Sequence, residues 1–251
     1  MIVSRRKLIG LSAAGAGGLL LGGCDRLNDT PAFRDVLKGA TGLNQRTQRL
    51  LMGGSLAKEF SESDISPVFK ANGSLAVGDP AYKAQLARGF TEWALRIDGL
   101  VKQPMLLPLT ALKAMAQRSQ ITRHDCVEGW SAVGKWQGPQ LGPILAAAGL
   151  LPNAKYAVFH CADTLEGVPY YESIDLVDAF HPQTILAWAL NGAPLTEPHG
   201  APIRLRVERQ LGYKQAKYIM RIELRETLMG LYRGGGGFWE DARGYQWYAG
   251  I

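Results

Sequence analysis

The sequence has little of several features that define common protein classes. Three cysteines in 251 residues are too few for a scaffold built on disulfides. Charged residues make up 20% of the chain and hydrophobic ones 47%, which excludes an intrinsically disordered protein. No internal repeat is visible, no alternation of strands and helices indicates a Rossmann fold, and no apolar run reaches the roughly 20 residues of a transmembrane helix. A globular protein with a sizeable core is expected.

The charge of the chain gives little support for a nucleic-acid partner. The formal net charge is +6, but Arg5, Arg6 and Lys7 contribute three of these charges in a segment that contains no acidic residue. Without those three, 25 basic residues face 22 acidic ones. We therefore expect no nucleic-acid partner, because so small an excess does not favour a polyanion.

Residues 1–23 have the pattern of an export signal. Arg5 and Arg6 stand just before the apolar residues 8–23, which are rich in Gly and Ala. This arrangement is typical of a signal peptide, and the twin arginine is similar to the Tat export signal. Residues 21–24, Leu-Gly-Gly-Cys, resemble a lipoprotein processing box that would make Cys24 the lipidated first mature residue. We expect a periplasmic protein with a lipid anchor at Cys24; the alternative is a soluble export signal with Cys24 near the cleavage site.

The rest of the chain divides into three parts by composition. Residues 24–89 are broken by Gly, Ser and Asn, which predicts an extension that wraps the core. Residues 90–232 are predicted to form the main domain. Residues 233–251 begin with four consecutive glycines after Arg233 and then contain five aromatic residues, which favours a pliable connector whose rings dock on the core over a cradle for a ligand.

Short strands outnumber helices in the predicted main domain. Trp93, Leu95 and Ile97 alternate with small or polar residues, which predicts a half-buried strand that ends at Gly99. Two short helices are expected, one capped by Thr110 and one over 141–148 that ends at Gly149. Further strands are predicted at 155–160, 184–190, 203–207 and 217–224, with a turn at 191–192. The pattern predicts an α+β fold dominated by β-structure.

Reactive side chains gather in two places. The first place contains Arg123, His124, Asp125, Cys126 and Glu128, and the second contains His160, Cys161 and Asp163. The basic neighbours of Cys126 would favour its thiolate, the form that acts as a nucleophile or metal ligand. The alternatives are a zinc site of the two His–Cys pairs, a Cys–His nucleophile and a structural disulfide. The ligand spacing does not fit zinc, and no Gly-rich nucleophile turn accompanies the thiol.

Basic residues gather in a third segment. Residues 204–217 contain Arg204, Arg206, Arg209, Lys214 and Lys217, with Gly212 among them. These cations are either the solvent-facing residues of two strands or an anchor for a phosphate group, since Arg and Lys bind phosphate and glycine lets backbone amides approach it. A cofactor with a phosphate tail and a metal would need this segment together with a thiolate.

Several motifs follow one another in a consistent order. They are RHDCVEGWS at 123–131 with Trp136 and Gly138 after it, AVFHCAD at 157–163, NGAPL at 191–195, HGAPIRL at 199–205, and LGYKQAK at 211–217 with RIEL at 221–224. In this order they resemble the molybdopterin-binding domain of the sulfite oxidase superfamily. The resemblance spans Phe90 to Glu226, with a looser echo in SPVFKANG at 66–73, and is greatest to the bacterial periplasmic branch that includes molybdenum-dependent methionine sulfoxide reductases. It implies a β-rich, mixed-sheet, sulfite-oxidase-like fold.

The resemblance also implies a cofactor and residues that hold it. One molybdopterin would bind molybdenum through its dithiolene, and Cys126 would complete the sulfur ligands. The implied cofactor-binding residues are Phe69, Lys70, Asn72, Cys161, His199, Arg204, Gly212, Lys214, Gln215 and Lys217. The remaining catalytic candidates, Arg123, His124, Asp125 and Glu128, would surround the metal or form the substrate pocket.

One departure from the sulfite oxidases narrows the implied activity. In the pattern that the resemblance gives for sulfite oxidases, arginines follow the cysteine closely. Here Cys126 is followed by Val127, Glu128, Gly129 and Trp130. An acidic and aromatic rim favours a neutral sulfoxide over a sulfite dianion. We expect two-electron oxygen-atom transfer, with electrons from a membrane haem protein or another periplasmic redox carrier. The alternatives are oxidation of a small sulfur compound as in sulfite oxidases, a cofactor-free thiol hydrolase and a binding protein.

Overall fold

The computed structural model describes residues 30–251, which form two compact units divided between Gly53 and Gly54. In the first unit, the described part is helix α2 (Pro31–Met52). Pro31 occupies the first turn, and the helix ends at Gly53, whose φ of 49° is accessible to glycine without strain. No helix within residues 30–251 combines the length and the apolar character needed to cross a membrane. The predicted signal peptide and Cys24 lie outside the described residues.

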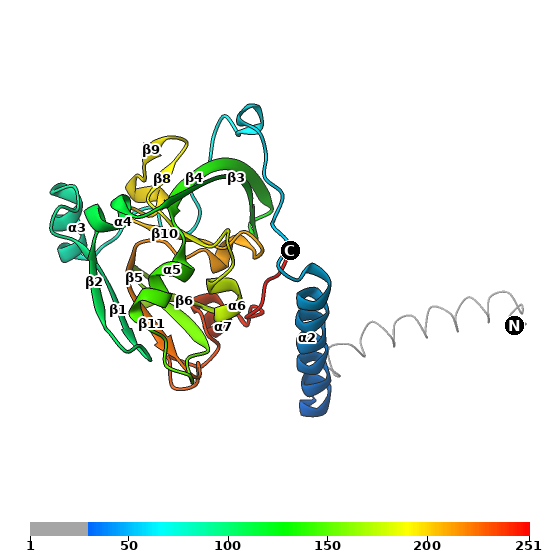
Figure 1. The fold of residues 1–251 in the computed structure, drawn as a ribbon. Coiled ribbons are helices and arrows are strands. Elements are labelled where there is room, and N and C mark those ends of the chain that lie inside the picture. Colours follow the sequence, from blue (N-terminus) through cyan, green and yellow to red (C-terminus); the bar gives the residue numbers. More distant parts are fainter. Residues whose placement is uncertain (1–29) are drawn as a thin grey trace, which may run out of the picture. The chain divides into compact units, whose positions relative to one another are not determined.

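The second unit, Gly54 to Ile251, has the α+β organisation expected from the sequence (Figure 1). Its strands are β1 (Ala94–Gly99), β2 (Met105–Pro108), β3 (Gln117–Cys126), β4 (Trp130–Pro139), β5 (Tyr156–Leu165), β6 (Val168–Asp175), β7 (Ile185–Ala187), β8 (Ala189–Leu190), β9 (Ala193–Pro194), β10 (Arg204–Arg206) and β11 (Ile219–Arg225). Its helices are α3 (Pro80–Ala87), α4 (Leu109–Ala114), α5 (Leu141–Ala148), α6 (Leu176–Ala179) and α7 (Phe238–Arg243), with single 3-10 turns η1 (Glu62–Asp64), η2 (Glu197–His199) and η3 (Gly212–Lys214).

A five-stranded mixed sheet forms the centre of this unit. Its order is β2-β1-β11-β5-β6, and only the β1–β11 pair is parallel within it. Leu95 and Ile97 of β1, Phe159 of β5 and Ile222 of β11 are fully buried, so the sheet contributes a large part of the hydrophobic core. The burial of Leu95 and Ile97 confirms the alternation that predicted β1.

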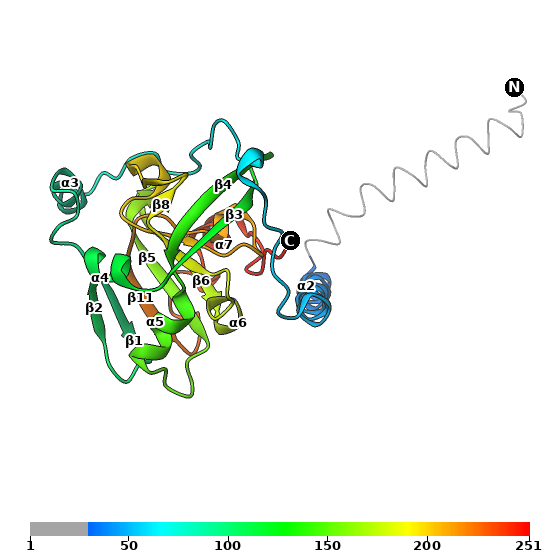
Figure 2. The ribbon, with the colours of Figure 1, turned by 45° about the horizontal axis from the view of Figure 1, so that its top comes forward.

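A second sheet positions the reactive residues. It has the order β3-β4-β8-β9, and its long, curved β3–β4 hairpin lies outside the five-stranded sheet (Figures 1 and 2). Trp136 of β4 is fully buried, and a Cβ on Gly138 would lie 2.0 Å from the carbonyl oxygen of Leu186. Only glycine therefore allows β4 to lie so close to the segment that contains β7. The two-stranded β10–β7 sheet continues the core beside it.

Several local predictions hold, and some differ. Helix α5 ends at Gly149 with a φ of 69°, and Asn191 and Gly192 form the turn between β8 and β9, as expected. Thr110 is not a cap, because α4 begins at Leu109 with Pro108 as its N-cap. The β3–β4 hairpin was not expected from the sequence.

The ends of the main unit also differ from the expected domain limits. The compact unit begins at Gly54 rather than at residue 90, since the backbone of Ala57 donates to the side chain of Gln183 at 2.7 Å and that of Val77 to Glu197 at 3.0 Å. The C-terminal residues belong to the same unit. Phe238 at the start of α7 is buried and packs on Tyr170 of β6 with ring centroids 5.6 Å apart.

Candidate active site

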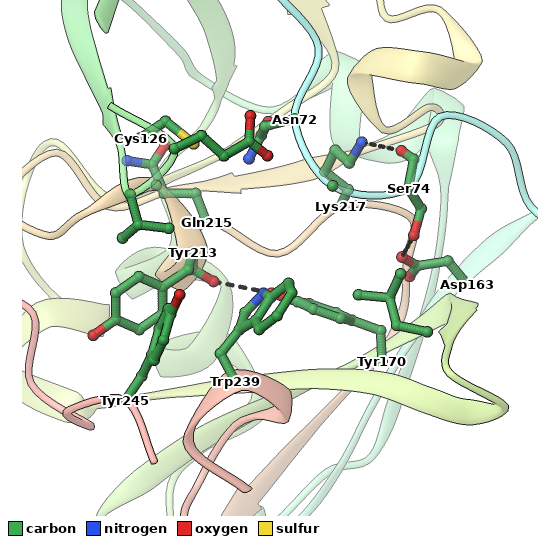
Figure 3. A pocket seen from close by; sticks show the side chains of 15 residues that line it. Asn72, Ser74, Cys126, Asp163, Tyr170, Tyr213, Gln215, Lys217, Trp239 and Tyr245 are labelled. Atoms are coloured by element: carbon green, nitrogen blue, oxygen red, sulfur yellow. Dashed lines mark hydrogen bonds between the residues drawn. The ribbon is translucent and has the colours of Figure 1, made fainter. Parts of the chain in front are cut away.

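A cavity of about 170 Å³ gathers residues from both ends of the main unit. Its lining residues are Asn72, Gly73, Ser74, Cys126, Val127, Glu128, Asp163, Leu165, Tyr170, Gly212, Tyr213, Gln215, Lys217, Trp239 and Tyr245. Figure 3 shows Cys126, Asn72 and Lys217 along one side and the rings of Tyr213, Tyr245, Trp239 and Tyr170 along the other. The cavity therefore has one polar side that contains a thiol and one aromatic side.

Cys126 reaches the cavity because it is the last residue of β3. The backbone N–H of Gly129 donates to its carbonyl oxygen at 3.1 Å, which closes the bend that leads to β4. Burial raises the pKa of the thiol, and the Glu128 carboxylate raises it further. The expectation that neighbouring bases favour the thiolate is therefore wrong for the metal-free protein. A metal ion would have to displace the thiol proton on binding.

The two basic neighbours of Cys126 explain this result. Arg123 is 57% exposed and its Nε donates to Asp125 at 3.0 Å, so its charge is directed to a surface ion pair. His124 is fully buried, and burial together with the Arg206 charge lowers its pKa well below its usual range. A neutral imidazole gives no electrostatic support to a thiolate. Arg123 and Asp125 do not line the cavity.

His124 instead lies behind the polar side of the cavity. Its Nδ1 accepts a hydrogen bond from Nη1 of Arg206 at 3.0 Å, which leaves the proton of the neutral ring on Nε2. That Nε2 has no hydrogen-bond partner in the described part of the chain. A Cβ at Gly212 would lie 2.5 Å from Nε2, so glycine is required for this loop to approach the ring.

Two buried cations near the cavity have no carboxylate in a salt bridge with them within residues 30–251. The Arg204 guanidinium donates only to the carbonyl oxygens of His199 and Gln215, at 3.3 and 3.4 Å, and its Nε has no partner. Burial and the Arg206 charge lower the pKa of Arg204 to about 9. Lys217 donates to the carbonyl oxygens of Ser74 and Pro198, and burial together with Arg204 lowers its pKa to about 7. Buried charge of this kind favours an anionic ligand.

Two other cations of the basic segment are paired with buried carboxylates. Arg206 holds Glu208 in a fully buried pair, with an Nη2–Oε2 distance of 2.6 Å, and its guanidinium lies 4.3 Å from the Trp136 ring centroid. Lys214 is also fully buried and binds Glu172 and Glu240. Lys214 does not line the cavity, because two carboxylates hold its ammonium away from it, and its role as a cofactor contact stays a prediction.

The remaining predicted contacts are divided between the cavity and its supports. Asn72 and Gln215 line the cavity. Phe69 packs edge-on against Trp136 at 5.0 Å, and His199 contacts its backbone, with Nε2 donating to the Phe69 carbonyl at 3.0 Å. The rings of Phe69 and His199 do not line the cavity, and Lys70 and Cys161 do not line it either. Cys161 packs against the core. These four lie behind or beside the cavity.

The rim of the cavity is less acidic than the sequence suggested. Glu128 accepts a hydrogen bond from the Trp130 indole at 2.9 Å, and the ammonium of Lys70 lies 3.9 Å from its carboxylate. Both side chains of this ion pair are about half exposed or more, so the pair contributes little stability, but Lys70 offsets the charge of Glu128.

The aromatic side was not assigned from the sequence. Trp239 of α7 stacks on Tyr245 with ring centroids 5.7 Å apart, and Tyr170 donates to the carbonyl oxygen of Tyr213 at 3.0 Å. The aromatic residues of the tail predicted that its rings pack on the core. Trp239 and Tyr245 also line the cavity. Glu240, next to Trp239, binds Lys214 at 2.6 Å and so attaches α7 to the core.

Asp163 was noted in the second reactive cluster and lines the cavity. Burial raises its pKa, while Ser74 donates to its Oδ2 at 2.7 Å and opposes that rise. Its Oδ1 has no hydrogen-bond partner in the part of the chain described here. Asp163 Oδ1 is therefore a buried polar atom that a ligand in the cavity could satisfy.

The donor set fits a metal cofactor that brings most of its own ligands. Buried polar atoms without a partner among residues 30–251 occur at Asn72 Oδ1, His124 Nε2, Asp163 Oδ1, Arg204 Nε and Gln215 Oε1. Such atoms are costly unless a ligand satisfies them. Within the same residues, no group of three or more His, Cys, Asp or Glu side chains could hold a metal, and both Cys126 and Cys161 are free. The His–Cys zinc site and the disulfide are therefore not formed.

Comparisons with known proteins agree with this cavity. The family described as "Oxidoreductase molybdopterin binding domain" matches residues 83–230, which is more than half of the chain. The chain belongs to this family. It is thus a molybdopterin-binding oxidoreductase of the sulfite oxidase superfamily, as its motifs implied.

The relatives are bacterial. The chain is 36% identical to a candidate protein-methionine-sulfoxide reductase subunit, YedZ1, of Azospira oryzae, over 98% of this chain and 88% of that protein. It is 31% identical to the protein-methionine-sulfoxide reductase catalytic subunit MsrP of Xanthomonas campestris, over 89% of this chain and 70% of that protein. Among solved structures, the sulfane dehydrogenase SoxCD of Paracoccus pantotrophus matches with a TM-score of 0.49 and 22% identity, over 55% of this chain and 39% of that chain.

The family match covers residues 83–230 of the chain. That segment includes Cys126, Arg204, Gly212 and Lys217 but ends before Trp239. The aromatic side of the cavity is therefore partly built by residues beyond the family match, where this chain can differ from other members.

Proposed function

We propose that this protein is the catalytic subunit of a periplasmic methionine sulfoxide reductase. The observation that supports this most is the cavity itself, where a thiol, the buried Lys217 ammonium and an aromatic wall meet in a molybdopterin-binding domain. The Arg204 guanidinium is buried behind the lining residue Gln215 and donates to its carbonyl oxygen. The relatives named as methionine sulfoxide reductase subunits supply the substrate class. In the overall reaction a sulfoxide, two electrons and two protons give a thioether and one water.

Each side of the cavity has a part in this reaction. Molybdopterin, when bound, supplies a metal capable of two-electron oxygen-atom transfer. Cys126 gives the metal one thiolate, and Arg204 and Lys217 hold the anionic tail of the cofactor. Asp163 offers its unpartnered Oδ1 as a hydrogen-bonding group to a ligand in the cavity. These roles use only atoms that the structure leaves without partners or places on the lining.

Trp239 and Tyr245 recognise the neutral substrate. A methionine sulfoxide side chain is uncharged at its polar end and apolar at its methyl and methylene groups. Aromatic rings contact such sulfur-containing groups favourably, by roughly 0.3–1.5 kcal/mol for each contact. The Lys70–Glu128 pair leaves no net charge at the rim from these two groups, so a small dianion such as sulfite gains nothing there.

Electrons and location complete the proposal. A membrane haem protein or another periplasmic redox carrier would supply the two electrons that reduce the metal. Tat export, followed by a lipid anchor at Cys24, would place the enzyme beside such a partner.

A paired substitution tests the proposal. Enzyme produced with molybdopterin biosynthesis present should contain molybdenum, oxidise a reduced viologen dye in the presence of methionine sulfoxide, and show little turnover with sulfite. Cys126→Ser should keep the pterin and lose turnover, whereas Cys161→Ser, off the cavity, should keep both. Full activity of Cys126→Ser, or faster turnover with sulfite than with the sulfoxide in the wild type, would overturn it.

A further inference from the structure

Helix α2 has a face that the catalytic function does not use. Among its side chains, Leu43, Leu50 and Leu51 are 67%, 83% and 77% exposed. Helical spacing places five apolar residues on one side of the helix. From Phe33 the steps to Ala40, Leu43 and Leu50 are seven, three and seven positions, and Leu51 follows Ala40 by eleven. The 22 residues thus form an amphipathic helix whose apolar stripe is open to solvent in at least its second half.

The charges of the same helix identify the kind of surface that fits this stripe. The segment contains Arg34, Lys38, Arg46 and Arg49 against the single acid Asp35. Arg34, Lys38 and Arg49 are separated by four and eleven positions, which places them on the side of the helix opposite the leucine stripe. Arg46, three residues after Leu43 and four before Leu50, lies at the edge of the stripe. A basic polar side beside an apolar stripe, with modest overall hydrophobicity, is typical of helices that lie in the interface of an anionic bilayer.

The position of the helix in the chain agrees with this partner. Pro31 lies seven positions after Cys24, the predicted site of lipidation, and seven residue steps span at most about 25 Å when fully extended. A lipid on Cys24 would therefore keep α2 within reach of the membrane surface. Two interior glycines, Gly39 and Gly42, weaken the isolated helix, so binding to a surface would add to its stability.

We propose that α2 is a membrane-surface helix that binds anionic phospholipid through its leucine stripe and its basic side. The helix lies in the headgroup region and does not cross the bilayer. This surface is independent of the catalytic assignment, since α2 belongs to a compact unit of its own and contributes no residue to the cavity (Figure 1).

Hydrogen exchange on the full processed protein tests this, because it reports on α2 separately from the anchor. Vesicles that contain phosphatidylglycerol should slow amide exchange over residues 31–52 at least tenfold, and vesicles of phosphatidylcholine alone should slow it much less. Lys38→Gln with Arg46→Gln should weaken the protection by about fivefold for each charge removed. Leu43→Ser with Leu50→Ser should abolish it, whereas Gln45→Ser with Gln48→Ser, a matched pair off the stripe, should leave it nearly unchanged.

Three results would overturn the proposal. Equal protection by both kinds of vesicle would remove the role of anionic lipid. Protection that rises with protein concentration in the absence of vesicles would show that a second copy of the chain covers the stripe. Absence of protection with every vesicle would show that α2 does not bind the bilayer.

Discussion

Replacing Lys214 by Met separates a structural role from a cofactor contact. Its ammonium lies between Glu172 and Glu240, and all three side chains are at most 2% exposed. Without the lysine, the two carboxyl groups remain buried with no cation beside them. Breaking a buried pair in this way costs roughly 3–5 kcal/mol. For a unit of about 200 residues, 1 kcal/mol shifts Tm by about 2–4 °C, so we expect Tm to fall by roughly 10 °C at pH 7.

Glu172→Gln is the matched control. Burial and the Glu240 carboxylate raise the pKa of Glu172 well above its usual range, and glutamine is a neutral group of the same shape that does not titrate. A raised pKa in the folded state means that Glu172 contributes its stability below its unfolded pKa and loses it as pH rises toward the folded value. Stability of the wild type should therefore fall over that pH range more steeply than stability of Glu172→Gln.

Thermal unfolding of the cofactor-free proteins between pH 5 and 9, followed by calorimetry, measures these differences. Bound pterin in protein purified at 10 °C gives the second readout, and Lys214→Met should retain it as long as the protein is folded. If Lys214→Met melts within 2 °C of the wild type and has lost its pterin, Lys214 anchors the cofactor and the structural role is refuted.

Other predictions concern the cavity. In the dye-linked assay, Trp239→Ala should raise KM for methionine sulfoxide up to about tenfold and leave kcat within about twofold. A tenfold rise is equivalent to about 1.4 kcal/mol of lost aromatic contact. Trp188→Ala, off the cavity, should change neither constant. Gly212→Ala should lower the bound pterin at least tenfold, as measured by its fluorescence, because the new Cβ meets His124 at 2.5 Å, whereas Gly78→Ala, with nothing within 4 Å, should retain it. Because the pKa of Lys217 is lowered to about 7, its charge is present below that pH and lost above it, so sulfate should bind the cofactor-free protein about tenfold more weakly at pH 8 than at pH 6 in a calorimetric titration. Lys217→Met should show no such change, and an equal pH dependence in that variant would contradict the assignment.

Sequence patterns predicted the parts of the fold in which side-chain polarity follows burial. Leu95 and Ile97 are buried on either side of the exposed Arg96, and this alternation predicted β1. Strand β3 has the opposite character, since its inward-facing residues Gln120, Thr122 and His124 are polar and are buried only because other polar groups meet them. No apolar period was present there to indicate a strand.

The sequence motifs indicated which residues gather near the cavity, but they did not indicate the direction in which a side chain points after a backbone turn. Cys126 and Lys217 line the cavity as the motif order implied. Lys214 stands three residues before Lys217 in the same motif, but the 3-10 turn at 212–214 directs it to Glu172 and Glu240, which lie 42 and 26 residues away in sequence. Such distant partners leave no local pattern in the chain.

The order in which the ribosome makes this chain sets a limit on when the cavity exists. Its lining extends from Asn72 to Tyr245, six residues from the final Ile251. A nascent chain from which Trp239 and Tyr245 have not yet emerged lacks part of the aromatic side, so the complete cavity forms only late in synthesis. A chain truncated before Trp239 would lose that ring and the attachment of Glu240 to Lys214 together, and the cavity would be open where α7 now lies.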